Sequence, residues 1–111
     1  MGTVRVMGEE MRVCSVDEVR PGTARRFDIG SHRIAVVRVE DDFYVIGDTC
    51  SHQAYSLSEG LVDEDDCLIE CPKHGSEFDL VTGAPRSLPA TKPVPTYEVR
   101  VDGGDVLVTV P

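Results

Sequence analysis

The sequence predicts an all-β domain. Short runs of valine, isoleucine and other apolar residues alternate with polar or charged stretches along the chain, and β-branched residues in runs of this length are typical of strands. No segment keeps the 3.6-residue spacing of apolar residues for three turns, as an amphipathic helix requires. A chain of 111 residues suits one domain with a modest core. We therefore expect a single domain over residues 1–111.

Three β-hairpins are predicted from pairs of apolar runs that flank a turn. The turns are rich in aspartate, glutamate or glycine, which favour tight turns. The paired runs are 33–39 with 43–46, 61–62 with 68–69, and 97–101 with 106–110. His32, just before the first of these hairpins, is expected in an exposed turn.

The segments outside the hairpins carry weaker signals. Residues 4–6 and 13–16 are short apolar runs that we expect to form strands. Ser15, followed three residues later by Glu18, is typical of the start of a helical turn. Residues 84–96 contain four prolines, so this segment is expected to be stiff and irregular, and it cannot lie in a central strand.

Composition favours a globular protein of the cytoplasm. The chain is 41% hydrophobic, and no apolar run approaches the ~20 residues of a membrane-spanning helix. The first ten residues lack the apolar core of a secretion signal. In a reducing compartment, four cysteines indicate metal binding or free thiols rather than disulfides.

The charge is unevenly distributed. Residues 1–39 carry seven basic and five acidic residues, a net of +2, and residues 40–111 carry four basic and fifteen acidic residues, a net of −11. The excess of negative charge disfavours nucleic acid as a partner, because phosphates would be repelled. It favours a basic protein partner, although acidity that only keeps the chain soluble is the alternative.

Two Cys/His pairs, Cys50 with His52 and Cys71 with His74, are candidates for a metal site. The hairpin over 61–69 lies between the pairs, so both can return to the same end of the domain. Two cysteines and two histidines can bind zinc tetrahedrally. They also suit a two-iron cluster with two thiolates on one iron and two imidazoles on the other. One Cys and one His in each loop favours the cluster over a zinc finger.

The motif CSH at 50–52, followed by CPKHGS at 71–76, resembles that of Rieske proteins. The resemblance extends over essentially the whole chain and is closest to the small Rieske-type ferredoxins of bacterial ring-hydroxylating oxygenase systems. It implies three stacked antiparallel sheets with a cluster-binding subdomain at one end. That subdomain would span about 47–88, covered by a Pro-rich loop at about 84–96.

The same resemblance implies one [2Fe–2S] cluster and a set of residues that bind it. Cys50 and Cys71 would bind one iron, and His52 and His74 the other. Ser76 would donate a hydrogen bond to the cluster. The two remaining cysteines are expected to be non-ligands.

Cys67 competes with Cys71 for the ligand role but lacks the Pro-x-His continuation, so we expect a free thiol. Cys14, in a strand-like run, is expected to be a small buried hydrophobe.

Three positions differ from the high-potential Rieske proteins of respiratory chains. Those proteins have an extra cysteine in each ligand loop, joined by a disulfide, and a tyrosine that donates to the cluster. The corresponding positions here are Tyr55, Lys73 and Phe78, so Ser76 alone remains of the two side-chain donors. Because hydrogen bonds to the cluster raise its reduction potential, we expect a potential below the respiratory type and above plant-type ferredoxins.

The resemblance implies an electron carrier rather than an enzyme, because a fully ligated cluster offers no open position to a substrate. The expected role is to carry single electrons from a flavin-dependent ferredoxin reductase to a terminal aromatic-ring oxygenase, with transient docking through the cluster end. Two alternatives stay open. One is an accessory protein of iron–sulfur assembly or redox sensing, and the other is a zinc-stabilised structural module.

Overall fold

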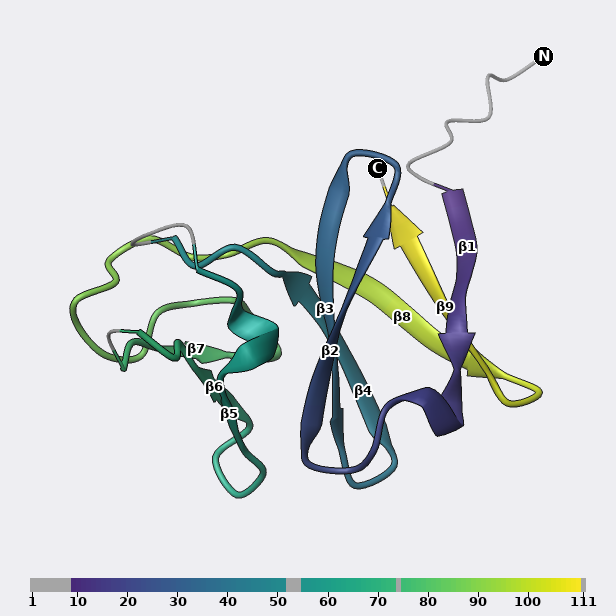
Figure 1. Ribbon diagram of the computed structural model, residues 1–111, viewed down its shortest axis with the longest axis horizontal. Coiled ribbons are helices and arrows are strands. Elements are labelled where there is room, and N and C mark those ends of the chain that lie inside the picture. The colour runs from purple at the N-terminus through teal and green to yellow at the C-terminus, as the bar shows by residue number, and fades with distance from the viewer. Residues whose placement is uncertain (1–8, 52–54, 74, 111) are drawn as a thin grey trace, which may run out of the picture.

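The computed structural model describes residues 9–51, 55–73 and 75–110, and within them the chain is almost entirely strand and turn (Figure 1). The strands form a six-stranded sheet in the order β1-β9-β8-β4-β3-β2 and a three-stranded sheet in the order β5-β6-β7. Their bounds, with those of two short 3₁₀ helices, are β1 (Glu9–Ser15), η1 (Val16–Glu18), β2 (Thr23–Ile29), β3 (His32–Val39), β4 (Asp42–Gly47), η2 (Leu57–Glu59), β5 (Leu61–Asp63), β6 (Leu68–Glu70), β7 (Glu77–Asp79), β8 (Thr96–Asp102) and β9 (Asp105–Val110). The described part of the chain has no helix long and apolar enough to cross a membrane.

The six-stranded sheet has a narrow junction at its centre. β4 and β8 pair only through Val45 with Tyr97 and Ile46 with Thr96, whereas β3 and β4 pair along the whole of β4. The sheet therefore consists of two three-stranded halves, β1-β9-β8 and β4-β3-β2. Together with β5-β6-β7 they make three antiparallel units.

The half formed by β2, β3 and β4 is the middle layer, because both faces of β3 are buried. Ile34 and Val36 pack with β1 and β9, and Ala35 and Val37 pack with the segment that follows β4. Alternate residues of a strand point to opposite faces, so a continuous apolar run suits a strand covered on both sides. This arrangement confirms the predicted all-β fold of three stacked sheets.

The three predicted hairpins are confirmed as β3–β4, β5–β6 and β8–β9. The β8–β9 turn consists of Gly103 and Gly104, whose φ angles of 59° and 87° favour glycine. The predicted helical turn is η1, where the Ser15 N–H donates to Glu18 Oε2 at 2.7 Å. The strand expected at 4–6 lies outside the described residues.

Two strands were absent from the prediction, and one residue was placed wrongly. β2 has charged residues on its exposed face and lacks a long apolar run, and β7 is only three residues long. His32 was expected in an exposed turn but begins β3. There it is half-buried, with its ring edge-on to Tyr97 at 5.9 Å between centroids. Because Ile29 pairs with His32, the turn consists of Gly30 and Ser31 alone.

Candidate metal centre

Two loops at one end of the molecule, here called the first and second Cys loops, are closed in the same way. In the first (49–56), Thr49 bridges Ser56, and the Cys50 N–H donates to the carbonyl of Tyr55 at 2.9 Å. In the second (70–77), Glu70 pairs with Glu77 and the Cys71 N–H donates to the carbonyl of Ser76 at 2.7 Å. Each cysteine thus occupies the same position in its loop. We call this end of the molecule the loop end.

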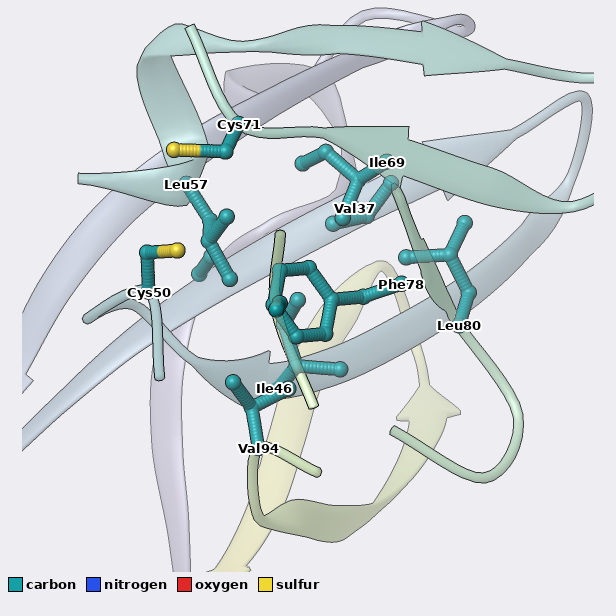
Figure 2. Close-up of a cluster of buried hydrophobic side chains, with 11 residues drawn as sticks. Val37, Ile46, Cys50, Leu57, Ile69, Cys71, Phe78, Leu80 and Val94 are labelled. Atoms are coloured by element: carbon teal, nitrogen blue, oxygen red, sulfur yellow. The ribbon is translucent and has the colours of Figure 1, made fainter. Parts of the chain in front are cut away.

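Cys50 and Cys71 lie in one buried cluster between the middle layer and β5-β6-β7. Their exposed fractions are 3% and 1%, and neither forms a disulfide within the described chain. Figure 2 shows the two side chains on the same side of this cluster, next to Leu57. The other members of the cluster are Ala35, Val37, Ile46, Ile69, Phe78, Leu80, Ala90 and Val94. The structure therefore brings together the two predicted cysteine ligands, whereas His52 and His74 lie outside the described residues.

Ser76 is fully buried beside the second cysteine. Its Oγ accepts a hydrogen bond from the Ala90 N–H at 3.1 Å. Since the oxygen is the acceptor in this contact, the hydroxyl hydrogen can still be donated to another group. Its backbone carbonyl also accepts from Cys71, which ties it to that cysteine.

The residues described here fit a Rieske cluster. Two buried cysteines reach one apolar region from matching loops, and the buried Ser76, whose hydroxyl hydrogen can still be donated, is bonded through its backbone to one of them. Thiolates and a hydrogen-bond donor are the groups that such a cluster needs from this part of the chain. Phe78, where a high-potential protein would have tyrosine, is fully buried in the same cluster and has no hydroxyl to offer.

The other two cysteines lie outside the two Cys loops, although Cys67 packs against the same buried cluster. Cys67 is a free thiol in the β5–β6 turn, at the opposite end of β6 from Cys71. The contact of its thiol with the Tyr44 hydroxyl, followed by burial, raises the pKa of Tyr44. Cys14 of β1 is buried between the β1-β9-β8 half and the middle layer, as predicted, and that burial raises the pKa of its thiol.

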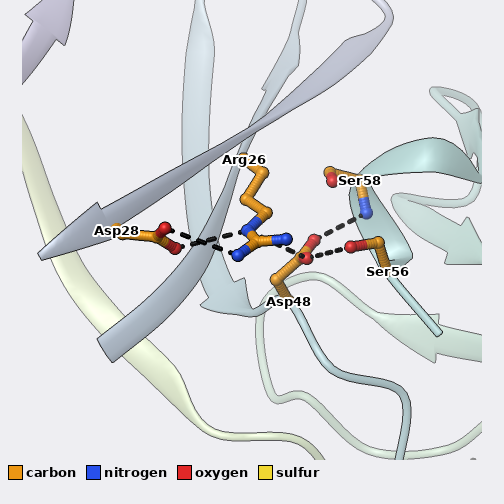
Figure 3. A network of polar contacts seen from close by, with 5 residues as sticks. All are labelled: Arg26, Asp28, Asp48, Ser56 and Ser58. Carbon is orange, nitrogen blue, oxygen red and sulfur yellow. Dashed lines mark hydrogen bonds and ion pairs between the residues drawn. The ribbon is translucent and has the colours of Figure 1, made fainter. Parts of the chain in front are cut away.

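A buried carboxylate that the sequence prediction missed supports the first Cys loop. Asp48 is 2% exposed and accepts hydrogen bonds from the Ser58 N–H at 2.9 Å and from the Ser56 hydroxyl. Arg26 of β2 places its Nε 4.0 Å from Asp48 Oδ2 and also pairs with Asp28 (Figure 3). The network links the loop to η2 and to the middle layer. The only local signal for it was an acidic residue at the end of a strand, directly before the loop.

The Pro-rich segment contacts both Cys loops. The Ser51 hydroxyl donates to the carbonyl of Lys92, and Ser76 accepts from Ala90. The Glu77 N–H also donates to Ser87 Oγ at 2.9 Å. As predicted for residues with so many prolines, this segment forms no strand before β8 begins at Thr96.

A further contact joins the two loops directly. Lys73 of the second loop places its Nζ 5.8 Å from the centre of the Tyr55 ring at the end of the first. These are the two positions at which the resemblance to high-potential Rieske proteins would require cysteines. A cation–π contact therefore occupies the place of a disulfide.

The chain matches the Rieske [2Fe–2S] domain over residues 9–98. It is 46% identical over 99 residues to Ferredoxin CarAc of Metapseudomonas resinovorans, covering 88% of this chain and 91% of that protein. It is 47% identical over 98 residues to the 3-phenylpropionate/cinnamic acid dioxygenase ferredoxin subunit of Escherichia coli K12, with the same coverage.

Solved structures of ferredoxins also resemble this chain. The ferredoxin of carbazole 1,9a-dioxygenase from Nocardioides aromaticivorans IC177 superposes with a TM-score of 0.86 at 40% identity, covering 89% of this chain and 95% of that one. A ferredoxin chain in a complex of reduced oxygenase and oxidised ferredoxin of carbazole 1,9a-dioxygenase superposes with a TM-score of 0.82 at 44% identity, covering 90% and 92%.

None of these relatives supports the zinc-stabilised module left open by the ligand types. Their names describe ferredoxins and the ferredoxin subunit of a dioxygenase. The chain therefore belongs to the Rieske [2Fe–2S] domain family, as a ferredoxin that carries one Rieske cluster and transfers electrons rather than catalysing a reaction.

Proposed function

We propose that this ferredoxin carries single electrons from a flavin-dependent reductase to a terminal aromatic-ring oxygenase, and that it does so in the cytoplasm. The observation that carries the proposal is the pair of matching loops, each with one buried cysteine at the same position. It is supported by 40–47% identity to ferredoxins of dioxygenase systems. A reducing compartment suits a chain whose Cys14 and Cys67 are unpaired.

The proposed ligands are Cys50 and Cys71 on one iron and His52 and His74 on the other, with Ser76 as a hydrogen-bond donor. A cluster with two histidine ligands accepts one electron more readily than an all-cysteine cluster, because it carries less negative charge before reduction. The buried apolar cluster around the cysteines would exclude water, and the Ser76 hydroxyl would donate a hydrogen bond that favours the reduced form. Four protein ligands leave no position for a substrate, which suits a carrier.

We propose that both partners dock at the loop end. A groove beside Cys71 supports this, since it is lined by Leu61 and Pro72 and flanked by Glu59 and Glu70. Leu61 is 74% exposed and offers apolar contact area at the edge of this groove. Its neighbour Gly60 has no room for a side chain, because a Cβ there would meet the Glu70 carbonyl at 1.7 Å. The partner surface would carry an apolar side chain with basic residues around it.

The experiment is a reconstituted electron-transfer assay. The purified chain with its cluster is mixed with an NADH-dependent flavoprotein ferredoxin reductase and a ring-hydroxylating oxygenase, and product formation is measured with and without the chain. We expect product only when all three proteins are present, together with a visible spectrum that bleaches on reduction. A chain that binds its cluster but is never reduced by such reductases would instead point to iron–sulfur assembly or redox sensing.

A further inference from the structure

The contact between Lys73 and Tyr55 joins the two Cys loops at the surface of the loop end. The Lys73 ammonium lies 5.8 Å from the Tyr55 ring centre, within the ~6 Å reach of a cation–π interaction. Tyr55 is 39% exposed and Lys73 is exposed, so the contact lies at the surface of the loop end. A positive charge is therefore held across the opening between the two loops.

Backbone hydrogen bonds connect both members of this contact to the cysteines. The Tyr55 carbonyl accepts from the Cys50 N–H at 2.9 Å. Lys73 lies two residues after Cys71, whose N–H and carbonyl bond to Ser76 and Gly75 at 2.7 and 3.1 Å. Because each loop is closed on its own cysteine, a contact between Lys73 and Tyr55 restrains the two cysteines relative to each other.

The charge of Lys73 is unusual for its surroundings. The chain has a net charge of −9 and contains only two lysines, Lys73 and Lys92. Glu59 and Glu70 line the neighbouring groove. A metal cluster that accepts an electron gains one negative charge, and a fixed cation nearby stabilises that form. A mobile lysine would stabilise it less, since its charge would spend more time in bulk water.

We propose that Lys73 and Tyr55 form an interloop clasp. The clasp restrains the two Cys loops and holds the Lys73 charge where it stabilises the reduced cluster. This inference rests on the proposed ligand set, and Lys73 acts in it as a positioning residue that does not touch the irons. The clasp takes the place of a covalent link between the loops and is independent of the redox state of any thiol.

The test measures the midpoint potential of the cluster-loaded protein and the rate at which a chelator removes its iron. Lys73→Gln is expected to lower the potential, because the cation is lost, and to speed iron loss about two- to fivefold, which corresponds to a contact of ~0.5–1 kcal/mol. Tyr55→Leu removes the ring but keeps the charge and is expected to speed iron loss similarly, with a smaller fall in potential. Lys73→Arg and Tyr55→Phe should retain both properties, because a guanidinium also stacks on a ring and phenylalanine keeps the ring.

Lys92→Gln is the matched control, since it removes the same charge from the same end without breaking the contact between the loops. Its backbone carbonyl, which accepts from Ser51, is kept. Equal falls in potential for Lys92→Gln and Lys73→Gln would overturn the clasp in favour of a general charge effect. No change in Lys73→Gln would overturn it outright. If the wild-type protein binds no cluster, the proposed function fails first, and that result is seen before any variant is compared.

Discussion

The two Cys loops have the same backbone closure but are supported by different parts of the molecule. The first loop is held by Asp48, a buried carboxylate linked to η2 and to Arg26 of the middle layer. The second is held by neutral contacts from the Pro-rich segment, through Ser76 with Ala90 and Ser87 with Glu77. Two loops with the same task thus depend on different chemistry.

Because of this difference, the residues that hold the cysteines in place can be distinguished from those that also affect the reduction potential of the cluster. The support of the first loop is ionic and consists of Asp48 with Arg26, Ser56 and Ser58. The support of the second loop includes Ser76, a residue that we also propose as a donor to the cluster. Loss of the first support should therefore change stability alone, whereas loss of the second should change stability and potential together.

The largest effect, loss of the cluster, is expected for the two cysteines that occupy the same position in their loops. Cys50→Ser and Cys71→Ser should each abolish cluster binding, because a serine hydroxyl is a poor ligand for iron in place of a thiolate. Iron and sulfide content and the visible spectrum measure this. Cys67→Ser is the control, since Cys67 lies at the other end of β6 and should leave both unchanged. If Cys50→Ser or Cys71→Ser kept the cluster while Cys67→Ser lost it, Cys67 would be a ligand in place of that cysteine.

The second prediction breaks the support of the first loop. Asp48→Ala leaves the Ser58 N–H and the Ser56 hydroxyl without their buried acceptor, which should lower the free energy of unfolding by about 1–3 kcal/mol. Urea unfolding followed by the visible absorption of the cluster measures it, and the midpoint potential is expected to stay the same. Asp28→Asn removes the exposed partner of the same arginine and should cost under about 1 kcal/mol. Equal losses in the two variants would show that the burial of Asp48 contributes nothing.

The third prediction concerns Ser76 in the second loop. Ser76→Ala removes the acceptor of the buried Ala90 N–H, which should cost about 1–2 kcal/mol, and it removes a hydrogen bond to the cluster, which should lower the midpoint potential. A redox titration and urea unfolding measure the two effects. Ser87→Ala is the control, since it removes an acceptor from the same support but no donor to the cluster, so stability alone should fall. A fall in stability without a fall in potential for Ser76→Ala would exclude its role as a donor.

The sequence correctly predicted the parts of the fold that depend on residues close together in the chain. The three hairpins follow from apolar runs on either side of short polar turns, and their register depends on few residues. β2 was missed because its neighbours in the sheet decide its conformation, while its own pattern of Thr, Arg and Asp resembles a loop. The pairing of β1 with β9 joins residues nearly a hundred positions apart, and no local pattern contains it.

For the site, too, the sequence predicted the features that are local in the chain and missed those that depend on tertiary packing. The spacing of cysteines and histidines was sufficient to predict two loops at one end, and the structure places Cys50 and Cys71 together. Asp48 was not predicted, because an acidic residue in an acidic chain is ordinarily a surface residue. Its burial depends on Arg26 and on Ser56 and Ser58, which reach it only after the sheets have packed. Supporting residues of this kind are properties of the tertiary structure.

The smallest expected effect is a pH dependence of stability that comes from the turn after β7. Hydrogen bonds to Asp79 from the Thr82 and Val81 N–H groups, together with Arg86 at 3.0 Å, hold the pKa of its carboxyl below the ordinary value of 3.8. A lowered pKa means that the folded protein binds this proton less tightly than the unfolded chain. The stabilisation is therefore present above 3.8 and is lost as the pH falls through the folded value.

Asp79→Asn should accordingly lower stability by ~0.5–1 kcal/mol near neutral pH, and its difference from the wild type should shrink between about pH 5 and about pH 3. Urea midpoints of both proteins across this range measure the difference. Any loss of the cluster in acid affects both proteins equally and therefore cancels in the comparison. Asp66→Asn, in the β5–β6 turn, is the control, because that side chain accepts no hydrogen bond within the described chain. A difference for Asp79→Asn that stays constant with pH would mean that the carboxylate charge does not stabilise the turn after β7.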